Sequence, residues 1–497
     1  MNKFFAKNDV QAWQWISFAV IATLVCLVYA TSLMHVARSD QVMYLAEVGH
    51  RHTLWDLTIG SMDLNRHRMF SPGDEILFRP VDYMLLGFEK YFFGNHFMLW
   101  QAVGILLHLV VVWFLLKCFL GMYRGVAAVM AAAYFALLFV NMEMVTWHHI
   151  HGYMIFVAVS LYALHRFFEV MNGKVPSSKD CFVIFLVLLI ASLTHEMGNV
   201  VALVLGTIVL IYKPQYRLFY RAFFLVPAAY VLASLFNAWA HPFNTTMYHH
   251  HLTQILGNGF YAMGVWLYTG LFPFELQWLF AARNMIAPEE KYLIKWPHLN
   301  NPASLFALII IAMLVFFLFH KRRSLATQNA TMVAGICFAL VAIFSFIIAI
   351  GRGSQWLIWE VIRVNTYYMY IFWVFMIVGV FAMVPWKDIG RVTKGIFYFI
   401  LAALIYMNAQ QLYLVNDKQV QDNNQIIVLV NTLEMFVAEH KNERGFSFYV
   451  APNYPGNFIY PELRRTDDPK TRQYSFIEAL YPQYFNAEEP QYKFLVR

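Results

Sequence analysis

Apolar runs long enough to cross a membrane recur along most of this chain. A bilayer core of about 30 Å requires roughly 20 apolar helical residues. Eleven stretches reach or approach this length: 15–34, 96–119, 125–141, 149–168, 181–194, 198–212, 218–237, 303–319, 331–350, 367–384 and 395–414. The pattern therefore predicts an all-α polytopic membrane protein with about eleven transmembrane helices. The first run follows Lys3 and Lys7 and is expected to be an uncleaved signal anchor.

Polar stretches separate or follow these runs. The three longest are 35–95, 238–302 and 415–497. In the first, the Arg79-Pro80 pair marks a chain break, and the amphipathic run 81–93 after it is predicted to lie along the membrane surface. In the second, the apolar run 255–280 has both ends on the same side, so we expect a surface or re-entrant segment.

The C-terminal stretch loses the apolar character of the preceding chain. Residues 419–440 have the pattern of an amphipathic helix, and Phe446 to Val450 that of a short strand. We expect two units. A transmembrane module covers 1–414 and includes the outer loops 35–95 and 238–302, and a small extracytoplasmic α/β domain covers 415–497.

Composition and charge agree with a membrane protein. Hydrophobic residues make up 60% and charged residues 13% of the chain, which excludes an ordinary soluble enzyme and a disordered chain. The four cysteines include no CxxC pair, so they predict neither a disulfide framework nor a metal site. The net charge of +7 arises largely from short basic loops, and it therefore does not indicate a nucleic-acid partner.

The basic loops predict the orientation, because Lys and Arg resist translocation. With a cytoplasmic N-terminus, every short basic loop falls on the cytoplasmic side, and the C-terminus becomes extracytoplasmic. The same rule favours a hairpin over one long broken helix for 181–212, because merging these two runs would reverse every later segment. The loop residues are Lys117, Arg124, Lys174, Lys179, Lys213, Arg217, Arg221, Lys321, Arg322, Arg323, Lys387, Arg391 and Lys394.

Several ionisable residues remain on the opposite, outer side, where they are costly near hydrocarbon and therefore suggest function. Asp40 follows the first segment and could deprotonate a hydroxyl at the bilayer surface, or be an ordinary solvated acid. Arg79 suits a phosphate as a planar bidentate donor, or serves as an interfacial anchor. Arg363, near Tyr367 and Tyr368, suits an anionic headgroup, or snorkels under an aromatic belt.

Two outer turns carry the other candidate residues. Glu143 precedes His148, His149 and His151, but no acid stands at the spacing of a zinc-protease helix, so we predict hydrogen-bonding or interfacial histidines and no metal. The second turn contains His195-Glu196. A carboxylate this close to hydrocarbon needs a partner, which is either Arg79 or a ligand, and a purely structural pair is the alternative.

The candidate residues belong to short motifs that follow one another in a recognisable order. They are Asp40, Phe78-Arg79-Pro80-Val81, Phe93-Gly94-Asn95 through Leu107-His108, Glu143-Met144-Val145-Thr146-Trp147, Ser192-Leu193-Thr194-His195-Glu196, and a spread-out motif from Arg363 to Tyr370. Over roughly residues 1–415 this order resembles the GT-C superfamily of polytopic glycosyltransferases, which includes protein O-mannosyltransferases and aminoarabinose transferases. Two positions depart from the pattern: His195 replaces the usual lysine, and Asp40 is a single acid where many relatives have two.

The resemblance implies an inverting transfer of a sugar from a polyprenyl-phosphate donor to an acceptor glycan, lipid or protein, outside the cytoplasmic (inner) membrane. It implies Asp40 as the base, and Arg79 and Arg363 as cations that bind the donor phosphate. Glu143 and Glu196 are expected to position a hydroxyl or an arginine. No cofactor or metal is expected. The remaining supporting residues are His148, His195, Tyr367 and Tyr368.

Two other classes compete with this interpretation. A transporter or flippase of a lipid-linked sugar, or of another anionic lipid, would need ionisable residues in the middle of helices or broken helices in paired halves. The sequence shows neither plainly. A polysaccharide polymerase or ligase would be expected to carry its largest outer loop late in the chain, whereas a large outer loop here directly follows the first segment.

Overall fold

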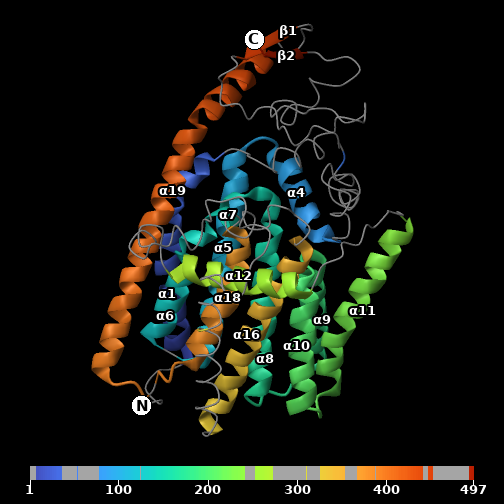
Figure 1. Cartoon of the computed structure of the whole chain (residues 1–497), viewed down its shortest axis with the longest axis vertical. Helices are drawn as coiled ribbons and strands as arrows, with labels where there is room; N and C mark the ends of the chain where they lie inside the picture. Colours follow the sequence, from blue (N-terminus) through green and yellow to red (C-terminus); the bar gives the residue numbers. More distant parts are fainter. Residues whose placement is uncertain are drawn as a thin grey trace.

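The computed structural model of the chain describes residues 7–35, 53, 78–123, 125–240, 252–271, 309, 325–352, 366–386, 388–439, 446–450 and 492–496. Nearly all of these residues are helical (Figure 1). The helices are α1 (Lys7–Val28), η1 (Ala30–Met34), α4 (Pro80–Phe93), α5 (Phe97–Met122), α6 (Val126–Ala136), η4 (Phe139–Asn141), α7 (Met142–Thr146), η5 (His148–Ile150), α8 (Gly152–Met171), α9 (Ser178–Thr194), α10 (Met197–Tyr212), α11 (Arg217–Ala240), α12 (Leu252–Leu271), α16 (Leu325–Arg352), α18 (Thr366–Met383) and α19 (Arg391–Glu439).

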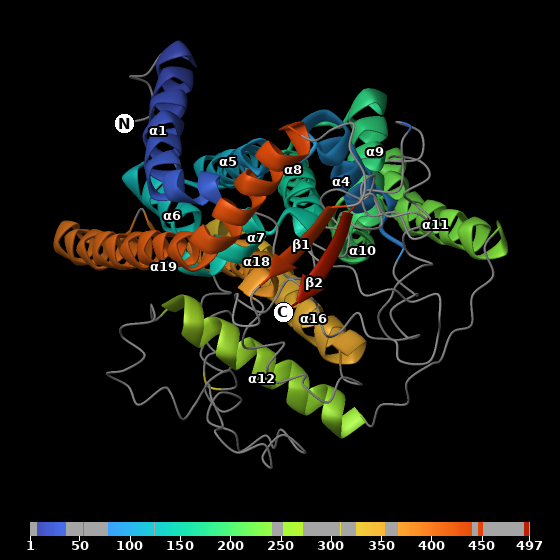
Figure 2. The same ribbon diagram turned by 90° about the horizontal axis from the view of Figure 1, so that it is seen from above.

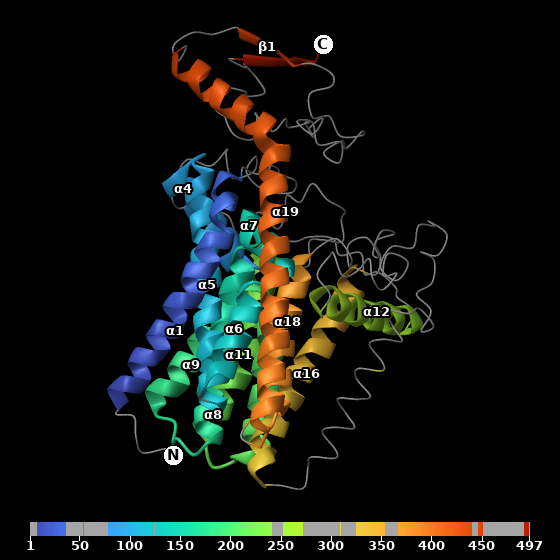
Figure 3. The ribbon, with the colours of Figure 1, turned by 90° about the vertical axis from the view of Figure 1, so that its left-hand side faces the viewer.

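The long helices form a bundle with roughly common direction, seen from two sides in Figures 1 and 3. Five described helices are long and apolar enough to cross a membrane, or six if one bent pair forms a single span. The chain is therefore a helical membrane protein. The five are Phe97–Met122, His148–Met171, Arg217–Phe236, Thr331–Ile350 and Arg391–Asp417, and shorter apolar helices are Ala12–Val28, Met197–Tyr212 and Tyr367–Met383.

The expected apolar segments lie on helices, but only five of them, or six with the bent pair, are long and apolar enough among the described residues to be candidate spans. Ten of the eleven coincide with helical residues, and the eleventh, 303–319, lies outside the described residues except for residue 309. Apolar side chains cover both faces of the outermost helices, as a lipid environment requires. On α1, for example, Ile21 and Val25 are buried, whereas Ile16 and Leu27 are each 62% exposed.

The α9–α10 pair is a hairpin. Only His195 and Glu196 separate the two helices, which lie side by side in Figure 1. The turn is tight because Gly198 has no side chain: a Cβ there would lie 2.4 Å from the backbone nitrogen of Ser192. The hairpin predicted from charge is therefore confirmed, and its tip brings His195 and Glu196 to the end of the bundle where α4 lies.

The expected helix 125–141 is broken in the structure. Helix α6 ends at Ala136, and the segment Phe139–Thr146 continues at an angle of 50°. Polar side chains pair with the backbone groups near this break. His108 Nε2 donates to the carbonyl of Ala136 at 2.9 Å, and Asn408 Oδ1 accepts from the backbone N–H of Phe139 at 3.2 Å. The other ring nitrogen of His108 accepts from the hydroxyl of Tyr370 at 2.9 Å.

Helix α12 runs across the bundle instead of along it (Figures 1 and 3). It covers most of the apolar run 255–280, for which the sequence predicted a surface or re-entrant segment. Close contacts fix it to α16 and α18. The site of Gly270 is filled by the ring of Trp373, whose Nε1 donates to the carbonyl of Trp266 at 2.9 Å, and Gly259 allows the ring of Phe346 to approach.

Helix α19 continues beyond the bundle as one uninterrupted helix. Two separate helices were expected, 395–414 and 419–440, whereas α19 spans 49 residues from Arg391 to Glu439. It contains no proline, and the asparagines and glutamines in its middle do not end it. Beyond it, strand β1 (Phe446–Val450) pairs in parallel with β2 (Tyr492–Val496), as seen from above in Figure 2. The predicted strand at 446–450 is therefore confirmed.

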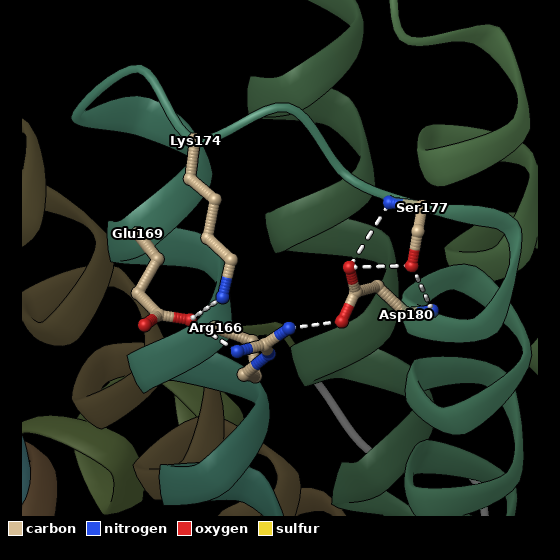
Figure 4. A network of polar contacts seen from close by, with 5 residues as sticks. All are labelled: Arg166, Glu169, Lys174, Ser177 and Asp180. Carbon is tan, nitrogen blue, oxygen red and sulfur yellow. Dashed lines mark hydrogen bonds and ion pairs between the residues drawn. The ribbon is translucent and has the colours of Figure 1, made fainter.

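An ion-pair network ties α8 to α9 at the end of the bundle opposite α4 (Figures 1 and 4). Arg166 binds both Glu169 and Asp180, and Lys174 contacts Glu169 at 3.1 Å. Asp180 and Ser177 form a reciprocal cap at the start of α9. The backbone N–H of Ser177 donates to the Asp180 carboxylate at 2.9 Å, and the backbone N–H of Asp180 donates to the Ser177 hydroxyl at 3.2 Å. These acids offset part of the basic charge on this side.

Candidate functional site

Arg79 stands immediately before α4, at one end of the bundle. Pro80 occupies the first position of α4, where its missing N–H costs nothing and its fixed φ favours the helix start. Phe78, which precedes Arg79, is also anchored, because the hydroxyl of Tyr230 on α11 donates to the carbonyl of Phe78 at 3.3 Å. Arg79 itself is only 8% exposed. The backbone therefore directs this guanidinium into the protein.

Glu196 is the partner of Arg79. The Nε and Nη2 groups of Arg79 donate to the two carboxylate oxygens of Glu196 at 2.8 and 2.6 Å. The third nitrogen, Nη1, donates to the hydroxyl of Tyr153, whose ring centre lies 5.1 Å from the guanidinium carbon. This is the bidentate geometry that makes arginine–carboxylate pairs strong and directional. The pairing of Glu196 with Arg79, one of the predicted alternatives, is confirmed.

The pair remains ionised because each charge compensates the other. Burial alone would raise the pKa of Glu196, but the charge and hydrogen bonds of Arg79 hold this pKa far below its usual value. Burial likewise opposes the charge on Arg79, and Glu196 reverses the effect so that the pKa of Arg79 rises. A salt bridge rather than a neutral hydrogen bond therefore occupies this position at physiological pH.

His195 is a buried, neutral residue. Its Nδ1 accepts the backbone N–H of Met197 at 3.2 Å, which helps to begin α10. Its ring stacks on Phe156 at 5.2 Å and meets Tyr153 edge-on at 4.9 Å. Burial lowers the pKa of His195 to about 3, and its Nε2 has no hydrogen-bond partner among the residues that the structure describes. His195 therefore supports the hairpin tip without contributing a charge.

Tyr367 and Tyr368 adjoin the Arg79 cluster through ring contacts. Tyr367 lies 6.2 Å from the ring of Tyr153 and 4.1 Å from that of Tyr368. Both tyrosines are buried at the start of α18. Tyr153 is thus the link between Arg79 and the aromatic residues of α18.

Glu143 reaches the same region from the other side. Its Oε2 accepts the backbone N–H of Tyr367 at 3.3 Å. A carboxylate at this position compensates a backbone donor in the first turn of α18 and the positive end of its dipole. Glu143 therefore joins α7 to α18.

His148 belongs to a neighbouring cluster. It stacks on Phe97 with ring centres 6.0 Å apart and meets His151 edge-on at 5.3 Å. His151 in turn contacts Glu89 of α4 at 3.2 Å. The structure thus separates the predicted site residues into an Arg79 cluster and a histidine cluster, both underneath α4.

Two predicted site residues, Asp40 and Arg363, lie outside the described residues. Among the residues that are described, no three His, Cys, Asp or Glu side chains are grouped closely enough to hold a metal.

The sequence interpretation did not identify Tyr153 or Glu89. Nothing distinguishes Tyr153 from the other aromatic residues of α8 until Arg79 is placed beside it. Glu89 could have been found, because residues 79, 82, 86 and 89 share one face of a helix. An acid on that buried face requires a partner, as Glu196 does.

Comparisons with known proteins leave the family open: no protein-family model, no curated protein and no solved structure matches this chain.

Proposed function

We propose that this chain is an inverting glycosyltransferase of the GT-C type, which moves a sugar from a polyprenyl-phosphate donor to an acceptor hydroxyl at the outer face of the cytoplasmic membrane. The observation that carries the proposal is Arg79. A guanidinium has five N–H donors, and three nitrogens of Arg79 each use one on Glu196 or Tyr153. Two N–H groups have no partner among the described residues, and they could bind phosphate oxygens.

The electrostatics of such a transfer suit this arrangement. As the bond from sugar to phosphate breaks, negative charge grows on the lipid phosphate, and a fixed cation stabilises it. Glu196 and Tyr153 fix the guanidinium before the donor binds, so little reorganisation is needed. Under the proposal Arg363 is the second cation, and Asp40 takes the proton of the acceptor hydroxyl.

The finer features of the proposal are those expected from the sequence. They comprise about eleven membrane spans, a cytoplasmic N-terminus, and an extracytoplasmic C-terminal domain that helps to form the acceptor site. Glu143, Glu196, His148, His195, Tyr367 and Tyr368 hold the site together, and Glu196 does so by positioning an arginine, which is one of the two roles that we expected for it.

Replacing Asp40 by Asn tests the chemistry without removing the side chain. We expect Asp40→Asn to abolish sugar transfer while the protein still inserts and accumulates in membranes, because an amide cannot accept the proton of the acceptor hydroxyl. The measurement is consumption of a polyprenyl-phosphate sugar by membranes containing each variant, with Asp180→Asn in the opposite ion-pair network as the matched control. Full activity of Asp40→Asn would remove this residue from the reaction.

The second candidate function is transport of a lipid-linked sugar or another anionic lipid. The observation that favours it is the break after α6, because broken helices with buried polar groups are common in transporters. His108, Tyr370 and Asn408 supply such groups here. A transporter would move the labelled lipid between leaflets of a vesicle and leave its sugar attached, whereas the transferase would release the sugar to an acceptor.

A further inference from the structure

Three consecutive residues at the start of α8 meet three ionisable residues of the α4 segment. His151 contacts Glu89 at 3.2 Å, and Tyr153 accepts a hydrogen bond from Arg79. Between them, Gly152 faces Asp82 so closely that a Cβ at position 152 would lie 2.1 Å from the Asp82 carboxylate. The face of α4 that carries Arg79 is therefore held by the same short segment that binds Glu89.

The contact between Glu89 and His151 is buried on all sides. The His151 side chain is fully buried and that of Glu89 is 2% exposed. His151 Nε2 lies 3.1 Å from the carbonyl of Val145, which also accepts from Gln101 Nε2 at 2.8 Å. Room for this arrangement comes from Gly104, where a Cβ would lie 2.5 Å from His151 Nε2.

Both ring nitrogens of His151 therefore face oxygen atoms. A backbone carbonyl can only accept, so Nε2 must carry a hydrogen for its bond to Val145. If Glu89 is ionised it too can only accept, and Nδ1 must then carry a second hydrogen. If Glu89 is protonated, it donates to Nδ1. In either form both bonds exist only while the pair of Glu89 and His151 holds one proton more than a carboxylate and a neutral imidazole do.

Burial disfavours the form in which Glu89 is ionised. The second oxygen of Glu89 has no hydrogen-bond partner among the described residues, and an ionised carboxylate would leave it uncompensated. Burial accordingly raises the pKa of Glu89, while the contact with His151 opposes this effect. Once the pair deprotonates, a lone pair of the imidazole must face either the carboxylate or the carbonyl of Val145, and one of the two bonds is lost.

We propose that Glu89 and His151 form a proton-dependent clasp, which holds α4 against the bundle while they share one proton and releases it when that proton is lost. The clasp positions Arg79 at the start of α4, and its consequence for donor binding rests on the proposed function. The sign follows from the extra proton that the two bonds of His151 require. The clasp is closed below the folded-state pKa of the pair and opens as the pH rises through it.

Other titratable groups surround the clasp, and the effects of their titration must be distinguished from those of the clasp itself. Asp82 and Lys90 lie on α4 itself, His148 approaches from η5, and Glu143 lies on α7. Beyond Tyr153 is the Arg79–Glu196 pair, which stays ionised throughout. Lys90 is the group whose titration is most easily confused with that of the clasp, because burial lowers the pKa of its ammonium group to about 8. This ammonium group donates to the side-chain oxygen of Asn95 at 2.7 Å.

Hydrogen–deuterium exchange of the α4 amides in the full-length, detergent-solubilised protein tests the clasp directly. Protection factors, corrected for intrinsic exchange, are compared from pH 4.5 to pH 9.5, because the pKa of Glu89 is raised from its ordinary value. In the wild type we expect protection of α4 to fall at least tenfold with rising pH. Glu89→Gln should remove this dependence while retaining protection, because its amide donates to His151 without a titratable proton. Glu89→Ala should lose protection at every pH.

Lys90→Met is the matched control on the same helix, and we expect it to keep the wild-type pH profile. The clasp is refuted if wild-type protection does not change with pH, if Glu89→Gln falls with pH as the wild type does, or if Lys90→Met abolishes the dependence. A second readout is the KM for the polyprenyl-phosphate donor, which should rise with pH in the wild type and not in Glu89→Gln. If no donor is consumed at any pH, the proposed function fails and the exchange data alone decide the clasp.

Discussion

At the scale of single residues, the Arg79–Glu196 pair has closely specified geometry. Removing two charges from water costs several kcal/mol, and their attraction offsets this only when the geometry is good. The two bonds of 2.6 and 2.8 Å meet that condition. Removing either partner alone is therefore costly, whatever net stability the intact pair confers.

A double-mutant cycle measures this coupling. We expect Arg79→Met and Glu196→Gln each to lower the free energy of unfolding by about 2–4 kcal/mol, because each leaves a buried or partly buried charge uncompensated. Together they should cost at least 1 kcal/mol less than their sum. Equilibrium unfolding in mixed micelles provides the measurement.

Arg166→Met, in the more exposed network of Figure 4, is the matched control. We expect it to cost about 1 kcal/mol or less, as for an ordinary surface ion pair. Additive effects of Arg79→Met and Glu196→Gln would show that the two side chains are not coupled.

His195 provides a second prediction, since the GT-C pattern that the sequence resembles usually has a lysine at this position. Here the fully buried ring lies between Phe156 and Tyr153, beside the charge of Arg79. An ammonium group there would be desolvated, and repulsion by the Arg79 guanidinium would offset part of the attraction of Glu196. His195→Lys should therefore destabilise the protein by about 3 kcal/mol or more, seen as a clear fall in thermal stability.

The neutral variant His195→Met should be much milder, because it loses only the acceptor for the N–H of Met197. We expect a cost of about 1–2 kcal/mol. A His195→Lys protein as stable as the wild type would mean that the lysine finds a partner, and that this pocket is not closed.

At the scale of elements, close approach of helices depends on a few glycines. Gly104→Ala would place a Cβ 2.4 Å from the carbonyl of Val145 and push α5 away from the segment that carries His151. We expect it to lower the free energy of unfolding by about 1–3 kcal/mol. Gly335→Ala on α16, where nothing lies within 4 Å, should be neutral or slightly stabilising. Equal effects of the two variants would contradict this packing.

The elements also show what the sequence could and could not predict. Apolar runs predicted helix positions well, because the length of a span follows directly from the bilayer. The cost of a carboxylate near hydrocarbon predicted that Glu196 needs a partner. The break after Ala136 was missed because its partners, His108 and Asn408, lie on distant segments. Tyr153 was missed for the same reason, since its importance comes only from Arg79.

At the scale of the whole molecule, the two ends of the bundle have different polar chemistry. One end carries α4, the Arg79–Glu196 pair and the Glu89–His151 clasp, whereas the other carries the Arg166 network between α8 and α9 (Figures 1 and 4). Helix α1 begins at the second end, where the short loops after α8 and α10 also turn (Figures 1 and 3). That the second end faces the cytoplasm stays a prediction from the basic loops.

The central claim is that the Arg79 end of the bundle uses a polyprenyl-phosphate sugar. Purified protein in proteoliposomes, given a panel of such donors with radiolabelled sugars, tests it most directly. We predict that the wild type and Asp180→Asn release polyprenyl phosphate from one donor, and that Arg79→Ala is at least tenfold slower. Failure of the wild type to consume any donor, or equal rates for the wild type and Arg79→Ala, would contradict the account.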